Sequence, residues 1–157
     1  MKDVSSFDGH PRAIYGDIFE GRFDFLTHIV IAGEVHNFNP TVVLNSGRLA
    51  ARAAQTIRNR EDWQHIKHWR IWQHNDDEGH RTTQVLIDGL GEDYTVNLVN
   101  HLYDDYNDLN QYWTDAPDTN RAALMAKIKS MQSAQNSYDT SVGTKTWHDL
   151  KNNPSFF

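Results

Sequence analysis

Apolar residues recur at the spacing of an α-helix along most of this chain. Between residues 40 and 59 the repeated residues are mostly small, which suits close packing of one helix on another. Between 94 and 114 they are large, between 119 and 138 the pattern is weaker, and 61–89 is compatible with one long helix or two consecutive ones. The stripes consist of Val43, Ser46, Ala50, Ala53 and Ile57, then Val96, Val99, Leu102, Tyr106, Leu109 and Trp113, and finally Ala123, Ile128, Met131 and Tyr138.

Residues typical of helix starts separate these segments. Asn39 and Pro40 predict the beginning of one helix, because Asn is a good N-cap and Pro suits the first helical position. Asn75 has Glu78 three residues later, a pattern similar to a capping box. It would begin a second helix within 61–89.

Residues 15–36 permit two interpretations. Helical spacing runs through the segment, yet the β-branched run at 28–31 could form a buried strand. We favour the helix, because nothing else in the chain offers such a strand a partner. The sequence therefore predicts an all-α protein, a single-domain antiparallel bundle of four to five helices plus a short C-terminal helix. That domain would span 1–157, with extended or loosely ordered ends at 1–13 and 151–157.

Composition restricts the classes of protein that remain. A length of 157 residues fits one domain. The absence of cysteine excludes disulfides, thiolate zinc sites, iron–sulfur clusters and a cysteine nucleophile. A net charge of -6 argues against direct nucleic-acid binding. The longest apolar run near the start, Ile29–Ala32, is too short for a membrane span or a signal peptide, so we expect no membrane association and a soluble, cytoplasmic protein.

Nine histidines are the most unusual feature of the composition, and four of them lie within residues 65–80. If that segment is helical, Asp76 and His80 are one turn apart and can reach the same ion. His101 and Asp105 repeat this spacing on the next predicted helix. No phosphate-binding loop, dinucleotide-binding motif or nucleophile elbow occurs in the chain.

These residue types suggest a metal centre, because imidazole and carboxylate groups suit zinc, iron, manganese or nickel and helical bundles place such ligands on facing helices. The predicted ligands are His28, Asp76, His80, His101 and Asp105, with Glu34 or Glu78 as a general base. Such a site would support metal-assisted hydrolysis, transfer or oxidation of a small molecule. Ordinary packing and solvation of the same histidines is the competing interpretation, and a haem or bilin held by histidine is a third.

Charge is distributed unevenly along the chain. Residues 48–70 carry six Lys and Arg against two acids, whereas 82–120 holds eight acids, several aromatic residues and no Lys or Arg. The two segments could simply neutralise each other within the fold. Alternatively, the protein is a non-enzymatic binding or assembly protein whose acidic, aromatic face at 82–120 engages a basic protein partner, or a homo-oligomer joined through opposite charge patches. The sequence leaves open whether the protein is an enzyme.

Overall fold

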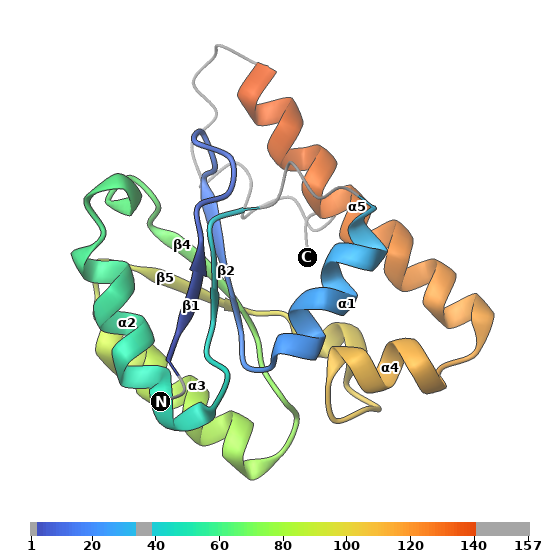
Figure 1. Ribbon diagram of the computed structural model, residues 1–157. Helices are drawn as coiled ribbons and strands as arrows, with labels where there is room; N and C mark the ends of the chain where they lie inside the picture. Colours follow the sequence, from blue (N-terminus) through green and yellow to red (C-terminus); the bar gives the residue numbers. More distant parts are fainter. Residues whose placement is uncertain (1–2, 34–38, 141–157) are drawn as a thin grey trace.

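The fold is built on a five-stranded mixed sheet (Figure 1). The computed structural model describes residues 3–33 and 39–140, except for the side chains of 132–140. The strands are β1 (Ser5–Phe7), β2 (Tyr15–Phe19), β3 (Thr41–Val43), β4 (His68–Trp72) and β5 (Thr95–Leu98), in the order β1-β3-β2-β4-β5. β1 is antiparallel to β3, and the other pairs are parallel.

Helices cover both faces of the sheet, so the protein has three layers (Figure 1). One layer contains α2 (Ala50–Asn59) and α3 (Asp77–Leu90), and the other contains α1 (Arg22–Ala32), α4 (Leu109–Asp115) and α5 (Asp118–Thr140). Short 3-10 segments lie at η1 (Gly47–Leu49), η2 (Glu61–Trp63) and η3 (Asn100–Tyr103). In the part of the chain that the structure describes, no helix combines the length and apolar character needed to cross a membrane.

The prediction of an all-α helical bundle is wrong, because five segments pair as strands of a sheet. The strands are three to five residues long. Four of the five residues of β4 are buried, as expected for a parallel strand that is covered on both faces. Over only five residues, the spacing of apolar side chains does not distinguish such a buried strand from part of a buried helix.

Each segment predicted to be helical before residue 119 contains a strand. Residues 15–36 contain β2 and then α1. The predicted helix is therefore confirmed only from residue 22. A strand is also present, but at 15–19 and not at 28–31, where the sequence offered the alternative. Pro40 precedes a strand rather than a helix, and α3 is capped by Asp76 instead of Asn75. The helix predicted at 119–138 is confirmed by α5. The predicted short C-terminal helix lies outside the described residues.

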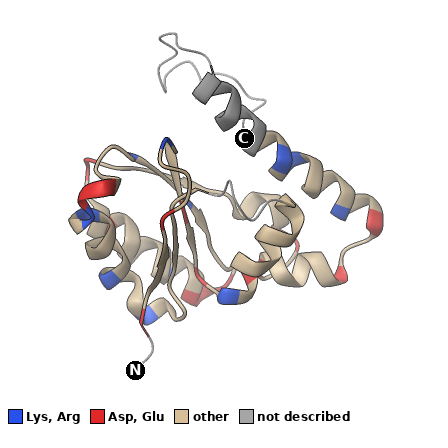
Figure 2. Ribbon diagram, turned by 45° about the horizontal axis from the view of Figure 1, so that its top comes forward, with Lys and Arg blue, Asp and Glu red and all other residues tan. Residues whose placement is uncertain are grey.

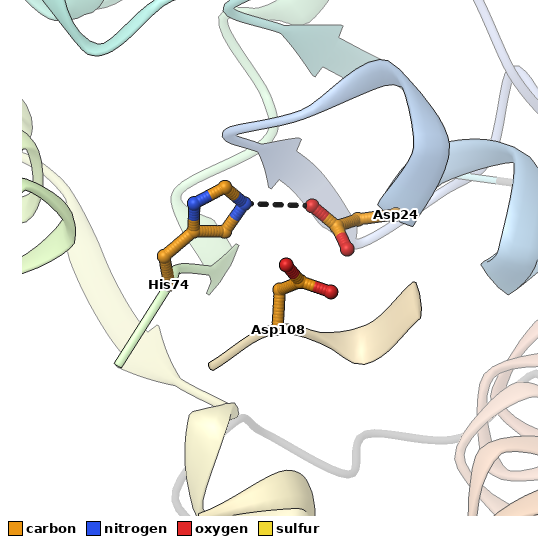
Figure 3. Close-up of side chains that lie close together, drawn as sticks. All are labelled: Asp24, His74 and Asp108. Carbon is orange, nitrogen blue, oxygen red and sulfur yellow. Dashed lines mark hydrogen bonds and ion pairs between the residues drawn. The ribbon is translucent and has the colours of Figure 1, made fainter. Parts of the chain in front are cut away.

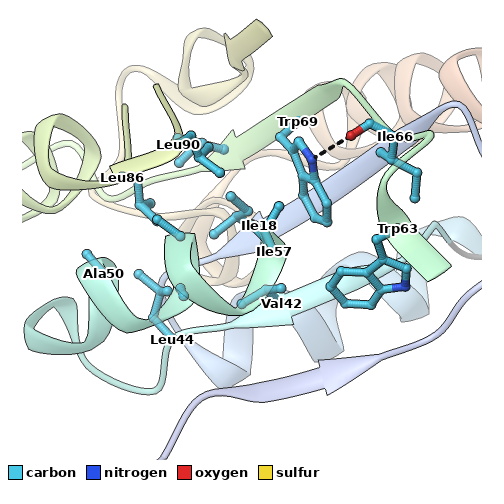
Figure 4. Packing of buried hydrophobic residues seen from close by; sticks show 13 residues of the cluster. Ile18, Val42, Leu44, Ala50, Ile57, Trp63, Ile66, Trp69, Leu86 and Leu90 are labelled. Atoms are coloured by element: carbon cyan, nitrogen blue, oxygen red, sulfur yellow. Dashed lines mark hydrogen bonds between the residues drawn. The ribbon is translucent and has the colours of Figure 1, made fainter. Parts of the chain in front are cut away.

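The layer of α2 and α3 packs on the sheet through one hydrophobic cluster (Figure 4). Its largest side chains include Trp63, Trp69 and Ile57, each at most 2% exposed. Small residues on α2 allow α3 to approach closely, since a Cβ at Gly89 would lie 2.8 Å from Cβ of Ala54. Close helix packing, which the sequence predicted for 40–59, is therefore present in this layer, although the contact at Gly89 is made by Ala54, which is not in the predicted stripe.

A second cluster joins the opposite face to α1, α4 and α5. Phe19 and Trp72 are partners on adjacent strands, and their rings stack with centroids 5.4 Å apart. Leu124 and Ile128 of α5 are buried against the same cluster. The two rings end β2 and β4, so the polar residues that follow them emerge at the same edge of the sheet.

The connections after β2 and β4 run in opposite directions. β2 continues through α1 to β3 on one side, and β4 continues through α3 to β5 on the other. In parallel α/β sheets, ligands bind at the carboxyl ends of the strands where adjacent connections diverge in this way. The edge beyond Phe19 and Trp72 is therefore the part of the fold that favours a ligand site.

Candidate functional site

Asp24, His74 and Asp108 meet at the carboxyl ends of β2 and β4 (Figure 3). Each offers one potential metal-ligand atom, and these atoms all lie within 4.8 Å of one another. Asp24 is the third residue of α1, His74 lies two residues beyond β4, and Asp108 is the N-cap of α4. Three separate elements therefore contribute to one cluster.

Asp24 is buried and accepts two hydrogen bonds. Nε2 of His74 lies 3.0 Å from its Oδ2, and the backbone N–H of Asn110 donates to its Oδ1 at 3.1 Å. The hydrogen bond to Asp24 raises the pKa of His74 to about 9; burial opposes the rise, and the nearby charges of Glu20, Asp24 and Asp108 add to it. At neutral pH without a metal, His74 is therefore a cation among carboxylates.

Glu20 adds a further carboxylate beside the cluster. It follows β2 directly, is 7% exposed, and its Oε2 accepts the backbone N–H of His74 at 3.3 Å. Burial raises its pKa; the charge of His74 opposes the rise, and the negative charges of Asp76 and Glu78 add to it. Crowding of negative charge at this edge favours a bound cation.

Glycines allow the loops after three strands to approach the cluster. A Cβ at Gly21, after β2, would lie 2.7 Å from Oδ2 of Asp24. A Cβ at Gly47, after β3, would lie 3.1 Å from Oε1 of Glu78 and would collide with Thr82. A Cβ at Gly79, after β4, would collide with the backbone carbonyl of His74. A larger residue at any of these positions would displace a wall of the site.

The ligand set predicted from the sequence is not the set that the structure brings together. Among the described residues, the cluster of potential ligand atoms contains none of its five members. Asp76 lies two residues after His74, and its Oδ1 caps α3 by accepting the Gly79 N–H at 2.7 Å. His80, His101 and Asp105 are exposed at other positions.

The two predicted general bases have different outcomes. Glu34 lies outside the described residues. Glu78 is exposed in the first turn of α3, pairs with Arg81 at 2.9 Å, and is close enough to Glu20 to raise its pKa. It therefore borders the cluster without belonging to it.

His28 lies in the core, away from any cluster of ligands in the described residues. It is 6% exposed, and its ring centroid lies 4.7 Å from that of Trp72 and 5.2 Å from that of Phe19. Burial lowers its pKa to about 4, while the charge of Asp17 opposes the shift and that of Arg70 adds to it. His28 is therefore a neutral core histidine.

We expect His28 to make the protein sensitive to acid. The unfolded chain takes up a proton near pH 6.5, whereas folded His28 does so only near pH 4. The free energy of unfolding should fall between these pH values by about 3 kcal/mol on account of this residue. Urea unfolding of the wild type, His28→Gln and the exposed control His101→Gln at pH 7 and pH 4.5 measures it. Equal losses in all three proteins would contradict the assignment.

The acidic segment 82–120 is not one continuous surface. It contains most of α3, then β5, η3 and α4. Tyr103 is 1% exposed and donates its hydroxyl to the carbonyl of Gln73 at 2.9 Å, so it is a core residue. Asp108 faces His74, whereas Asp104 and Asp105 are exposed. Lys and Arg lie on helices of both outer layers, α2 and α5 included (Figure 2).

Sequence reasoning assigned none of Glu20, Asp24, His74 and Asp108 to the site. A signal was present in the two apolar runs that end in polar residues. Ile18-Phe19 is followed by Glu20, and Ile71-Trp72 is followed by Gln73 and His74. Polar residues directly after buried parallel strands meet at one edge of the sheet, but this pattern is informative only once the runs are known to be strands.

Comparisons with family models, curated proteins and solved structures find no match to this chain. Its function is therefore inferred from the geometry and chemistry of the site.

Proposed function

We propose that this protein is a divalent-metal-dependent enzyme that hydrolyses or transfers a phosphate ester. Asp24, His74 and Asp108 hold the metal. The observation that carries the proposal is their convergence, with ligand atoms within 4.8 Å of one another, at the carboxyl ends of adjacent parallel strands.

The donor set suits a small group of metals. One imidazole favours zinc, iron or nickel, and carboxylates favour manganese or magnesium, so the mixed set is best matched by Mn²⁺, Fe²⁺ or Zn²⁺. Three protein ligands leave coordination positions for water and substrate. A metal bound here would supply an activated water and neutralise charge on the substrate.

The charge around the cluster supports a divalent cation. Glu20, Asp76 and Glu78 add negative charge to that of the two carboxylates in the ligand set. Repulsion from Asp76 and Glu78 contributes to the raised pKa of Glu20. A divalent cation would relieve this repulsion. Glu20 is the candidate general base, because it is buried beside the cluster and burial raises its pKa.

Arginines at the same edge support a phosphate group as the substrate. Arg22 begins α1, Arg48 lies in η1 after β3, and Arg81 lies near the start of α3, so each follows a different strand. All three are exposed. Guanidinium groups at the edge of the sheet that holds the carboxylates match the two needs of phosphoryl transfer, which are charge stabilisation and orientation of phosphate oxygens.

The metal site predicts a specific pH dependence. Metal must displace the proton on His74, whose pKa is about 9 in the metal-free protein. Affinity for Mn²⁺ should therefore increase about 10-fold per pH unit up to that value, or about 100-fold from pH 6 to pH 8. Titration with Mn²⁺, followed by the EPR signal of the free ion, measures this. A His74→Gln variant should bind weakly, with no such slope.

Activity is tested with p-nitrophenyl phosphate and bis(p-nitrophenyl) phosphate in the presence of Mn²⁺ and after chelation. Release of nitrophenol that depends on Mn²⁺ and is lost in the Glu20→Gln variant supports the proposed reaction. Failure of the wild type to bind Mn²⁺, Fe²⁺ or Zn²⁺ at pH 8 would refute the proposal.

A further inference from the structure

Asp108 is supplied by a segment far from the rest of the site along the chain. Asp24 and His74 lie in the segments that follow β2 and β4, whereas Asp108 belongs to the connection between β5 and α4, which includes η3. The structure must therefore hold residues 100–108 against the end of β4.

Asn75, the residue that follows His74, holds residues 100–108 against the end of β4. Its side-chain amide donates to the carbonyl of Tyr103 at 3.2 Å and to the carbonyl of Tyr106 at 2.8 Å. Its Oδ1 accepts a hydrogen bond from the side chain of Asn100 at 2.7 Å. Its backbone N–H donates to the carbonyl of Asn107 at 2.7 Å. One residue thus contacts the segment at four points, ending at the neighbour of Asp108.

Hydrogen bonds also hold the chain just after Asp108. Asn110, in the first turn of α4, donates its backbone N–H to Asp24 at 3.1 Å and accepts a side-chain hydrogen bond from Thr27 at 3.0 Å. These bonds join α4 to α1, whereas those of Asn75 join the segment to β4. Asp108 lies between the two attachments, with its Oδ1 accepting the N–H of Gln111 at 2.7 Å.

We propose that Asn75 is a positioning residue that holds Asp108 in the ligand set. This inference rests on the metal site proposed above. Asn75 contacts backbone carbonyls and an amide of residues 100–107, so it acts through Asp108. Residues that orient metal ligands in this way contribute about 10–100-fold to metal affinity.

A double-mutant cycle tests the proposal. Asn75→Ala should weaken Mn²⁺ binding about 10-fold at pH 8. In the Asp108→Asn background the same substitution should cost little further affinity, because the ligand that Asn75 positions is already missing. Equal losses in both backgrounds would mean that Asn75 only stabilises the fold, and would overturn the proposal.

A matched control is available at Asn45. It also follows a strand and donates its side-chain amide to backbone carbonyls, but of Asp3 and Val43. Asn45→Gly, which suits the φ of 60° at this position, should leave Mn²⁺ affinity unchanged. An equal loss in this variant would also overturn the proposal.

Hydrogen exchange separates this inference from the metal proposal. In the metal-free protein, Asn75→Ala should accelerate amide exchange across 100–110 and leave α2 unchanged. Asn75→Asp, which keeps the acceptor for Asn100 and loses both donors, should do the same if the alanine variant folds poorly. Unchanged exchange at 100–110 overturns the role of Asn75, whereas absence of Mn²⁺ binding by the wild type refutes the metal site alone.

Discussion

Replacing Asp17 by alanine should lower the free energy of unfolding by about 3–5 kcal/mol. Asp17 is 2% exposed and forms a two-point ion pair with Arg70, which is 5% exposed, with N–O distances of 2.8 and 2.7 Å. Its carboxylate also accepts from Trp72 Nε1 at 2.9 Å and from Asn39 Nδ2 at 2.7 Å. The substitution would leave the guanidinium of Arg70 buried without a counter-charge.

The state of Asp17 in the folded protein agrees with this expectation. Burial alone would raise its pKa, but the charge and hydrogen bonds of Arg70, with smaller contributions from His28 and Trp72, lower it below the usual value. The carboxylate is therefore ionised, and both of its oxygens accept hydrogen bonds. Because small domains are stable by only about 5–15 kcal/mol, the loss is a large fraction of the total.

Urea unfolding at pH 7 measures the effect of Asp17→Ala. The control is Asp3→Ala, because Asp3 pairs with Arg52 at 3.0 Å with both side chains more than half exposed, and such a pair contributes less than about 1 kcal/mol. If Asp17→Ala does not fold, the double variant Asp17→Leu/Arg70→Met should recover a folded protein, since it removes both charges. A loss below about 1 kcal/mol for Asp17→Ala would contradict the role of the pair.

Replacing Asp24 by asparagine should weaken Mn²⁺ binding at least about 100-fold at pH 8, because it removes a charged ligand at the centre of the cluster. The same change should lower the pKa of His74 from about 9 toward its ordinary value, since the hydrogen bond to Asp24 is the main cause of the rise. Asparagine still accepts the Asn110 N–H through its carbonyl oxygen. The fold should therefore persist.

Two measurements check the Asp24→Asn prediction. Mn²⁺ titration reports the metal, and NMR titration of the imidazole C–H resonances reports His74 without any metal. Asp105→Asn is the matched control, because Asp105 is exposed three residues before Asp108 and was a ligand predicted from the sequence. If Asp105→Asn reduced Mn²⁺ affinity as much as Asp24→Asn, the ligand set predicted from the sequence would be supported over the cluster of Asp24, His74 and Asp108.

Helix α5 and the close contact of α2 with α3 were predictable from the sequence. The period over 119–138 matches α5, and α2 is rich in buried alanines, one of which, Ala54, lies against Gly89 of α3. Both features depend on neighbours three or four residues apart on the same helix, and local spacing contains that information. The same spacing gave the wrong prediction where short segments such as 68–72 belong to strands that are covered on both faces.

By itself, the sequence determined that any metal site must use nitrogen and oxygen ligands, because the chain has no cysteine, and that histidine and aspartate are abundant enough to supply them. Only the tertiary structure decided which of them meet. Asp24, His74 and Asp108 are 50 and 34 residues apart along the chain, and they converge because β2 and β4 are adjacent while their connections diverge. Strand order results from long-range packing of the whole sheet, so no local period along the chain encodes it.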